Sequence, residues 1–109
     1  MAHSSSKQIL RTLSRENAFY FFTSVGNYTG YNVVSLDEFG STIKEVETTS
    51  LEFHLYRGDF EKWVDEVLGD KILTRRINAV KILELVGNSL RDQLIFTVSK
   101  RLDELKSAT

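Results

Sequence analysis

The pair Gly-Asp occurs twice within a short stretch of this chain, at residues 58–59 and again at residues 69–70. Glycine readily adopts the left-handed backbone conformation that ends a helix, and an aspartate carboxylate can accept hydrogen bonds from the first N–H groups of the next helix. The repeated pair therefore predicts three successive helices joined by tight corners. We expect the first helix at residues 50–57, capped by Ser50, and the second to begin at the cap residue Asp59.

The second predicted helix has its apolar residues on one side, as expected for a helix that packs on a core. After it, helical periodicity extends from residue 70 to residue 86 and resumes after Gly87-Asn88, with Ser89 as the new cap. The helix at residues 70–86 is apolar on more than one side, so it needs burial on more than one side. We expect the last two helices to pair as an antiparallel hairpin, either at the centre of the domain or at a subunit interface.

The N-terminal part of the chain has a different pattern. The aromatic run at residues 18–23, A-F-Y-F-F-T, favours a β-strand, and residues 31–34 favour a second strand after a long, turn-rich loop. A helix across residues 14–22 is the alternative. Ser35-Leu-Asp-Glu38 then matches the capping box that opens a helix.

These patterns predict a mainly α fold: a small helical domain of about five helices with a short N-terminal β-hairpin. The polar start of the chain predicts a flexible N-terminal segment at residues 1–13, followed by a single globular domain at residues 14–109.

Composition excludes several function classes. The net charge of −1 over 109 residues provides no overall attraction to phosphate, which disfavours nucleic-acid binding. The absence of cysteine excludes disulfides and thiolate metal sites. No apolar run approaches the roughly 20 residues of a membrane span, so we expect no membrane partner and a cytoplasmic location.

The catalytic motifs that we considered are missing. The chain has two histidines, His3 and His54, which is too few for the usual histidine-rich metal sites, so we expect neither a metal nor a cofactor. The G-x-S-x-G motif of hydrolases is absent, and the glycines at 26 and 30 lack the G-K-[ST] ending of a phosphate loop. We therefore expect that the protein is not an enzyme, unless a partner chain supplies the missing groups.

One constellation remains as a candidate site. Asp59 is close enough in sequence to orient the imidazole of His54, and Arg57 is placed to hold an anionic ligand. The structural interpretation is that His54 is a packed residue, Asp59 a helix cap and Trp63 part of the core, and we favour this interpretation. Aromatic residues near the hairpin loop are expected at the surface. The candidate ligand-binding residues are His54, Arg57, Asp59, Trp63, Tyr28 and Tyr31.

The order F-Y-F-F-T, S-L-D-E-F, F-H-L-Y-R-G-D-F-E-K-W and L-G-D-K-I-L resembles a family of small archaeal and bacterial domains known only as a domain of unknown function. The resemblance covers roughly residues 18–77, and F-H-L-Y-R-G-D-F-E-K-W at residues 53–63 is its most specific part. It implies a domain boundary and no particular activity.

Two hypotheses for function follow. The first is a protein-interaction or oligomerisation module, most directly a homodimer, because the C-terminal helices carry more apolar surface than one hairpin can hide. The alternative is a small-molecule-binding or regulatory domain with its site around His54, Arg57 and Trp63. The candidate interface residues of the first hypothesis are Val80, Ile82, Val86, Phe96 and Val98.

Overall fold

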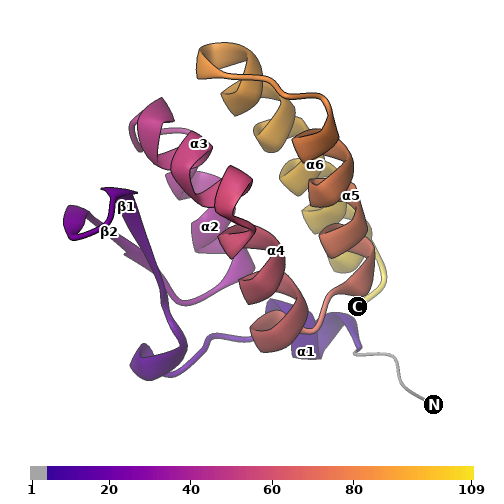
Figure 1. Cartoon of the computed structure of the whole chain (residues 1–109). Coiled ribbons are helices and arrows are strands. Elements are labelled where there is room, and N and C mark those ends of the chain that lie inside the picture. The colour runs from indigo at the N-terminus through magenta and orange to yellow at the C-terminus, as the bar shows by residue number, and fades with distance from the viewer. Residues whose placement is uncertain (1–4) are drawn as a thin grey trace.

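The computed structural model describes residues 5–109 and shows a mainly helical domain with a two-stranded hairpin near its N-terminus (Figure 1). The described residues contain six α-helices, where we expected about five. In chain order the elements are α1 (Ser6–Leu10), the 3₁₀ turn η1 (Arg15–Asn17), β1 (Phe19–Ser24), β2 (Asn27–Val33), α2 (Leu36–Thr42), α3 (Thr48–Arg57), α4 (Asp59–Lys62), the π-helix η2 (Trp63–Leu68), α5 (Lys71–Ile82) and α6 (Gly87–Ser107).

The predicted hairpin is present, with a shorter connection than expected. Strands β1 and β2 pair antiparallel, with Phe19 opposite Val33, and only residues 25–26 join them. Gly26 has a φ of 79°, which glycine adopts without strain, and this allows the tight turn. The long loop and the alternative helix across residues 14–22 were therefore both wrong.

The elements form three layers in Figure 1, with the hairpin on the left, α2 to α4 in the middle, and α5 and α6 on the right. Strand β1 packs against α3, and its inward side chains meet aromatic rings from the middle layer. The rings of Phe19 and Phe60 lie 5.3 Å apart, and those of Phe39 and Phe60 lie 5.1 Å apart in an edge-to-face arrangement. This aromatic core fixes the hairpin on the helices.

The predicted helix boundaries are partly confirmed. Ser35 accepts a hydrogen bond from the backbone N–H of Glu38, as the capping box requires. Gly58 and Gly69 have φ values of 83° and 79° and end their helices in the left-handed conformation. Asp70 caps α5 through the N–H of Leu73. Asp70, the aspartate of the second Gly-Asp pair, therefore caps the following helix as predicted.

Two other caps were predicted wrongly. Asp59 makes no capping hydrogen bond to α4, because its carboxylate faces His54 instead. Ser50 lies inside α3, whose N-cap residue is Glu47. Helix α3 therefore begins earlier than the cap pattern indicated.

The connection between α5 and α6 comes earlier in the chain than predicted. Helix α5 ends at Ile82 instead of continuing to residue 86, and α6 begins at Gly87 without a cap from Ser89. Glu84 has a φ of 57° in the connection, an unusual conformation for a residue other than glycine. The chain reverses at residues 83–86, which the periodicity had assigned to the helix.

The packed part of the chain begins before residue 14. Ile9 on α1 and Leu13 just after it are buried in the core. Arg11 donates a hydrogen bond to the backbone oxygen of Val67, which ties α1 to η2. This differs from the predicted flexible segment at residues 1–13, of which residues 1–4 lie outside the described part. The apolar residues of α1 and the turn after it are too few to give a long periodic pattern, although Ile9 and Leu13 pack in the core.

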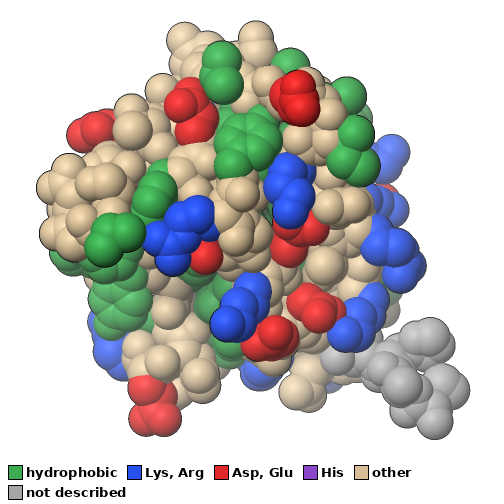
Figure 2. All heavy atoms as spheres, viewed as in Figure 1, with side chains coloured by type: hydrophobic (Ala, Val, Ile, Leu, Met, Phe, Trp, Pro, Cys, Tyr) green, Lys and Arg blue, Asp and Glu red, His purple; other side chains and the backbone are tan. Residues whose placement is uncertain are grey.

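Lys, Arg, Asp and Glu side chains are interspersed over the face formed by α4 and α5, and no single sign of charge dominates it (Figure 2). Within residues 5–109, none of the helices has the length and apolar character needed to cross a bilayer.

Candidate functional site

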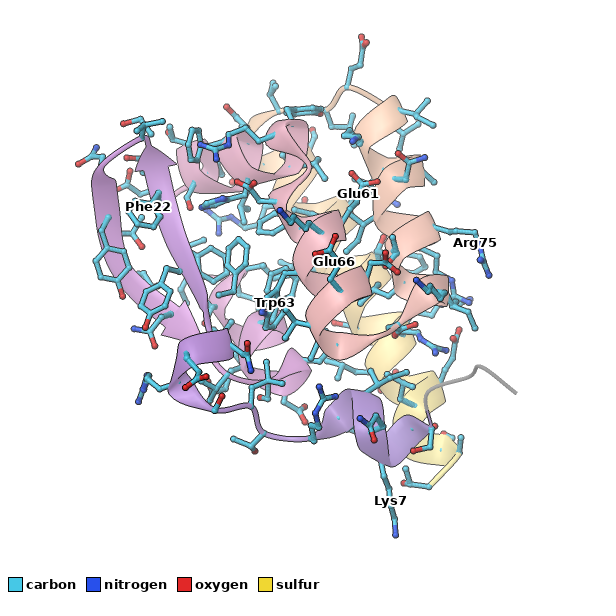
Figure 3. All side chains as sticks on the ribbon, turned by 60° about the horizontal axis from the view of Figure 1, so that its bottom comes forward. Lys7, Phe22, Glu61, Trp63, Glu66 and Arg75 are labelled. Carbon is cyan, nitrogen blue, oxygen red and sulfur yellow. The ribbon has the colours of Figure 1, made fainter. Side chains whose placement is uncertain are left out.

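A groove of about 530 Å³ lies between β1 on one side and α3, α4 and η2 on the other. Its walls are mostly apolar and include the aromatic side chains of Phe22 from β1, Phe53 from α3 and Trp63 from η2. Arg57 and Lys62 bring positive charges to it. The volume falls in the range of roughly 300–1,000 Å³ that is typical of sites for small molecules. Figure 3 shows Trp63 between the helices and the hairpin, with Phe22 on the hairpin.

His54 lies against this groove but is itself buried, with 4% of its surface exposed. Its Nε2 accepts a hydrogen bond of 2.7 Å from the backbone N–H of Phe22, and its Nδ1 lies 2.8 Å from the Oδ2 of Asp59. Since a backbone N–H can only donate, Nε2 must be unprotonated, and the proton must sit on Nδ1 facing Asp59. The geometry therefore requires a neutral imidazole.

The electrostatics of His54 agree with this geometry. Burial lowers the pKa of His54 below its ordinary value of 6.5, and the hydrogen bond and charge of Asp59 raise it only in part. The charge of Arg57 adds to the lowering. With both ring nitrogens engaged, His54 has no free lone pair for a ligand. Its role is to fix β1 on α3, which positions one wall of the groove.

Arg57 and Asp59 meet at the same corner. The Nε of Arg57 lies 3.3 Å from the carboxylate of Asp59, and its guanidinium carbon lies 4.6 Å from the ring centre of Phe53. Such a cation–π contact keeps the guanidinium over the Phe53 ring in the groove wall. The contact between Asp59 and His54 forms in place of the capping role that we favoured for Asp59.

The other predicted ligand-binding residues divide into two groups. Trp63 lines the groove, is nearly buried, and donates its indole N–H to the backbone oxygen of Asn17. Tyr28 and Tyr31 are exposed on β2, as expected, but neither lines the groove. The structure therefore brings His54, Arg57, Asp59 and Trp63 together and leaves both tyrosines outside.

Several groove residues were not predicted from the sequence, most notably Phe22, Phe53 and Lys62. Phe53 and Arg57 are four residues apart on α3, a spacing that places two side chains on the same helix face. That spacing was a usable signal. The contribution of η2 was not predictable in this way, because a π-helix has no clear sequence pattern. It places Trp63, Glu66 and Val67 along the groove, and π-helical turns are frequent at functional sites.

The predicted interface residues also divide. Val80 and Val98 are buried in the core, so their assignment to an exposed interface was wrong. The physical reason is that α4 packs on α5, and α2 and α3 pack on α6, covering faces that the helical hairpin alone would expose. Ile82, Val86 and Phe96 stay between 62% and 70% exposed.

No group of three or more His, Asp or Glu side chains in residues 5–109 is arranged to hold a metal ion. The carboxylates of Glu61 and Asp65 form separate ion pairs with Lys81 and Lys71, at 2.6 and 2.5 Å. Glu61 and Asp65 therefore act as partners of lysines and do not form a pair of carboxylates with each other.

Comparisons with known proteins leave the site to be interpreted from its own geometry. No family model matches the chain, and neither a curated protein nor a solved structure is similar to it. The resemblance to a domain of unknown function therefore stays a prediction.

Proposed function

We propose that this protein is a small-molecule-binding domain whose site is the groove between β1 and the helices α3, α4 and η2. The observation that carries the proposal is the convergence of three aromatic side chains, Phe22, Phe53 and Trp63, on one cavity of about 530 Å³. Aromatic walls with a few polar groups are the usual composition of ligand sites. His54 and Asp59 support the groove by holding β1 and α3 together.

The neutral fluorescent probe N-phenylnaphthylamine tests this proposal, because its emission rises when it enters an apolar site. We expect saturable binding to the wild-type protein. Phe53→Ala removes a wall of the groove and should weaken the affinity by roughly tenfold, since an aromatic side chain contributes about 1.5 kcal/mol or more to an apolar contact.

The matched control is Phe96→Ala, which removes the same atoms from an exposed site on α6 that shares no residue with the groove. The control should bind the probe as the wild type does. Absence of saturable binding, or an equal loss in both variants, would contradict the proposal.

A homodimer through the C-terminal helices is the second candidate. The observation in its favour is the exposure of Ile82, Val86 and Phe96, which leaves apolar surface in contact with water. If these residues form the dimer contact, light scattering at high micromolar concentration should give twice the monomer mass, and Phe96→Asp should restore the monomer mass. A wild-type protein that stays monomeric under these conditions excludes this candidate.

A further inference from the structure

The positive side chains of the groove have hydrogen-bond donors that are not used within residues 5–109. The Nε of Arg57 faces Asp59, but neither terminal nitrogen of the guanidinium has an acceptor among residues 5–109. The side chain is about half exposed, and Phe53 holds it in place from one side. A fixed guanidinium with free N–H groups is the arrangement that binds a carboxylate or a similar anion with two parallel hydrogen bonds.

Lys62 adds a second positive charge from α4, the helix that follows the corner at Gly58. It is exposed, lines the same groove, and pairs with no carboxylate in the described part of the chain. Both cations therefore remain available to a ligand.

The negative groups of the groove do not cancel this preference. Asp59 already faces His54 and Arg57 through the same oxygen, Oδ2. Glu66, the other carboxylate of the lining, is exposed on η2, four residues after Lys62, and forms no ion pair with Arg57 or Lys62.

We propose that the groove selects small molecules that carry one anionic group on an aromatic or branched apolar body. The anion would bind the terminal nitrogens of Arg57, with Lys62 as a second partner, and the body would lie between Phe22, Phe53 and Trp63. This inference rests on the proposed function and names its ligand class. The volume of about 530 Å³ suits a molecule of two fused or linked rings.

Two probes that differ in a single anionic group test the inference. Anilinonaphthalene sulfonate is N-phenylnaphthylamine with one added sulfonate, so the ratio of their affinities isolates the contribution of the anion. We expect the sulfonate to bind roughly tenfold more tightly than the neutral probe, because a hydrogen bond to a charged group contributes about 1.5–3 kcal/mol. The preference should shrink as the salt concentration rises.

Single substitutions show which residue causes the preference for the sulfonate probe. Arg57→Gln should abolish most of the tenfold ratio, Arg57→Lys should keep part of it, and Lys62→Gln should reduce it less. Arg75→Gln is the matched control, because Arg75 is exposed on α5 and points away from the hairpin (Figure 3). It should leave the ratio unchanged. If Arg57→Gln does not fold, the Lys62→Gln ratio and the salt series decide the question.

The outcomes separate this inference from the proposed function. Binding of the neutral probe that depends on Phe53, with no preference for the sulfonate, would overturn the inference and leave the proposed function standing. A sulfonate preference that survives Arg57→Gln, or that Arg75→Gln removes, would also overturn it. Failure of both probes to bind would overturn the proposed function as well.

Discussion

Asp70→Asn is expected to lower the free energy of unfolding by about 3 kcal/mol, the lower end of the cost of breaking a buried ion pair, because Arg101 keeps Glu104 as a second partner. Asp70 is 1% exposed, and its two oxygens have separate roles. Oδ1 accepts the N–H of Leu73 at 3.0 Å and caps α5, while Oδ2 accepts the Nε–H of Arg101 at 2.8 Å and joins α5 to α6. The amide of the variant can still cap the helix, but its NH₂ group would face the buried guanidinium.

Asp65→Asn is the matched control, since it makes the same chemical change in a carboxylate that is about one-third exposed and paired with the exposed Lys71. It should cost less than about 1 kcal/mol, as is usual for surface ion pairs. Urea denaturation of both variants measures the difference. Equal losses in the two variants would show that the pair between Asp70 and Arg101 does not hold α5 on α6.

His54→Leu is expected to destabilise the protein by about 2–3 kcal/mol, because it leaves the N–H of Phe22 without an acceptor. Leucine is similar in size to histidine, so the loss reports the hydrogen bonds more than the packing. The same change removes the partner of Asp59 and loosens the contact between β1 and α3. Probe binding in the groove should weaken together with stability.

The pH dependence of stability is the specific signature of His54. Burial lowers its pKa in the folded state below the ordinary 6.5, so below pH 6.5 the unfolded chain binds more protons than the folded one. The stability contributed by the neutral imidazole is complete above that pH and is lost as the pH falls toward the folded-state pKa. The slope is at most about 1.4 kcal/mol per pH unit for one proton. The urea midpoint of the wild type should decrease as the pH is lowered through this range. His54→Leu should lack this part of the pH dependence.

Much of the fold was predictable because it depends on local chemistry. The capping box at Ser35 and the left-handed glycines at 58 and 69 act over a few residues, and the structure uses them as predicted. The aromatic run at residues 18–23 similarly predicted strand β1. Phe19 and Phe21 are both buried on the same face.

The features that build the groove depend on contacts that local residue patterns do not specify. Asp59 has the sequence context of a helix cap, and only the presence of His54 beside it decides that its carboxylate turns the other way. The bond from Phe22 to His54 joins residues 32 positions apart. The π-helix η2 is closed by the N–H of Asp70 bonding to the oxygen of Val64. No short sequence pattern predicts such contacts.

The burial of the C-terminal helices was also only partly predictable from the sequence. Their periodicity correctly indicated apolar faces, but it did not indicate which neighbours would cover them. Gly40 on α2 approaches α6 so closely that an added Cβ would lie 3.1 Å from Leu102 and 3.4 Å from Val98. This close approach buries Val98, and it reduces the apolar surface that had suggested a dimer.

The central claim is that the groove beside His54 binds a ligand, and an NMR titration with N-phenylnaphthylamine locates binding most directly. The backbone N–H of Phe22 and the indole N–H of Trp63 are reporters inside the groove, and the backbone N–H of Phe96 is a reporter outside it. We expect the probe to shift the first two signals saturably and to leave the third unchanged. Shifts at Phe96 with no change at Phe22 and Trp63 would contradict the claim.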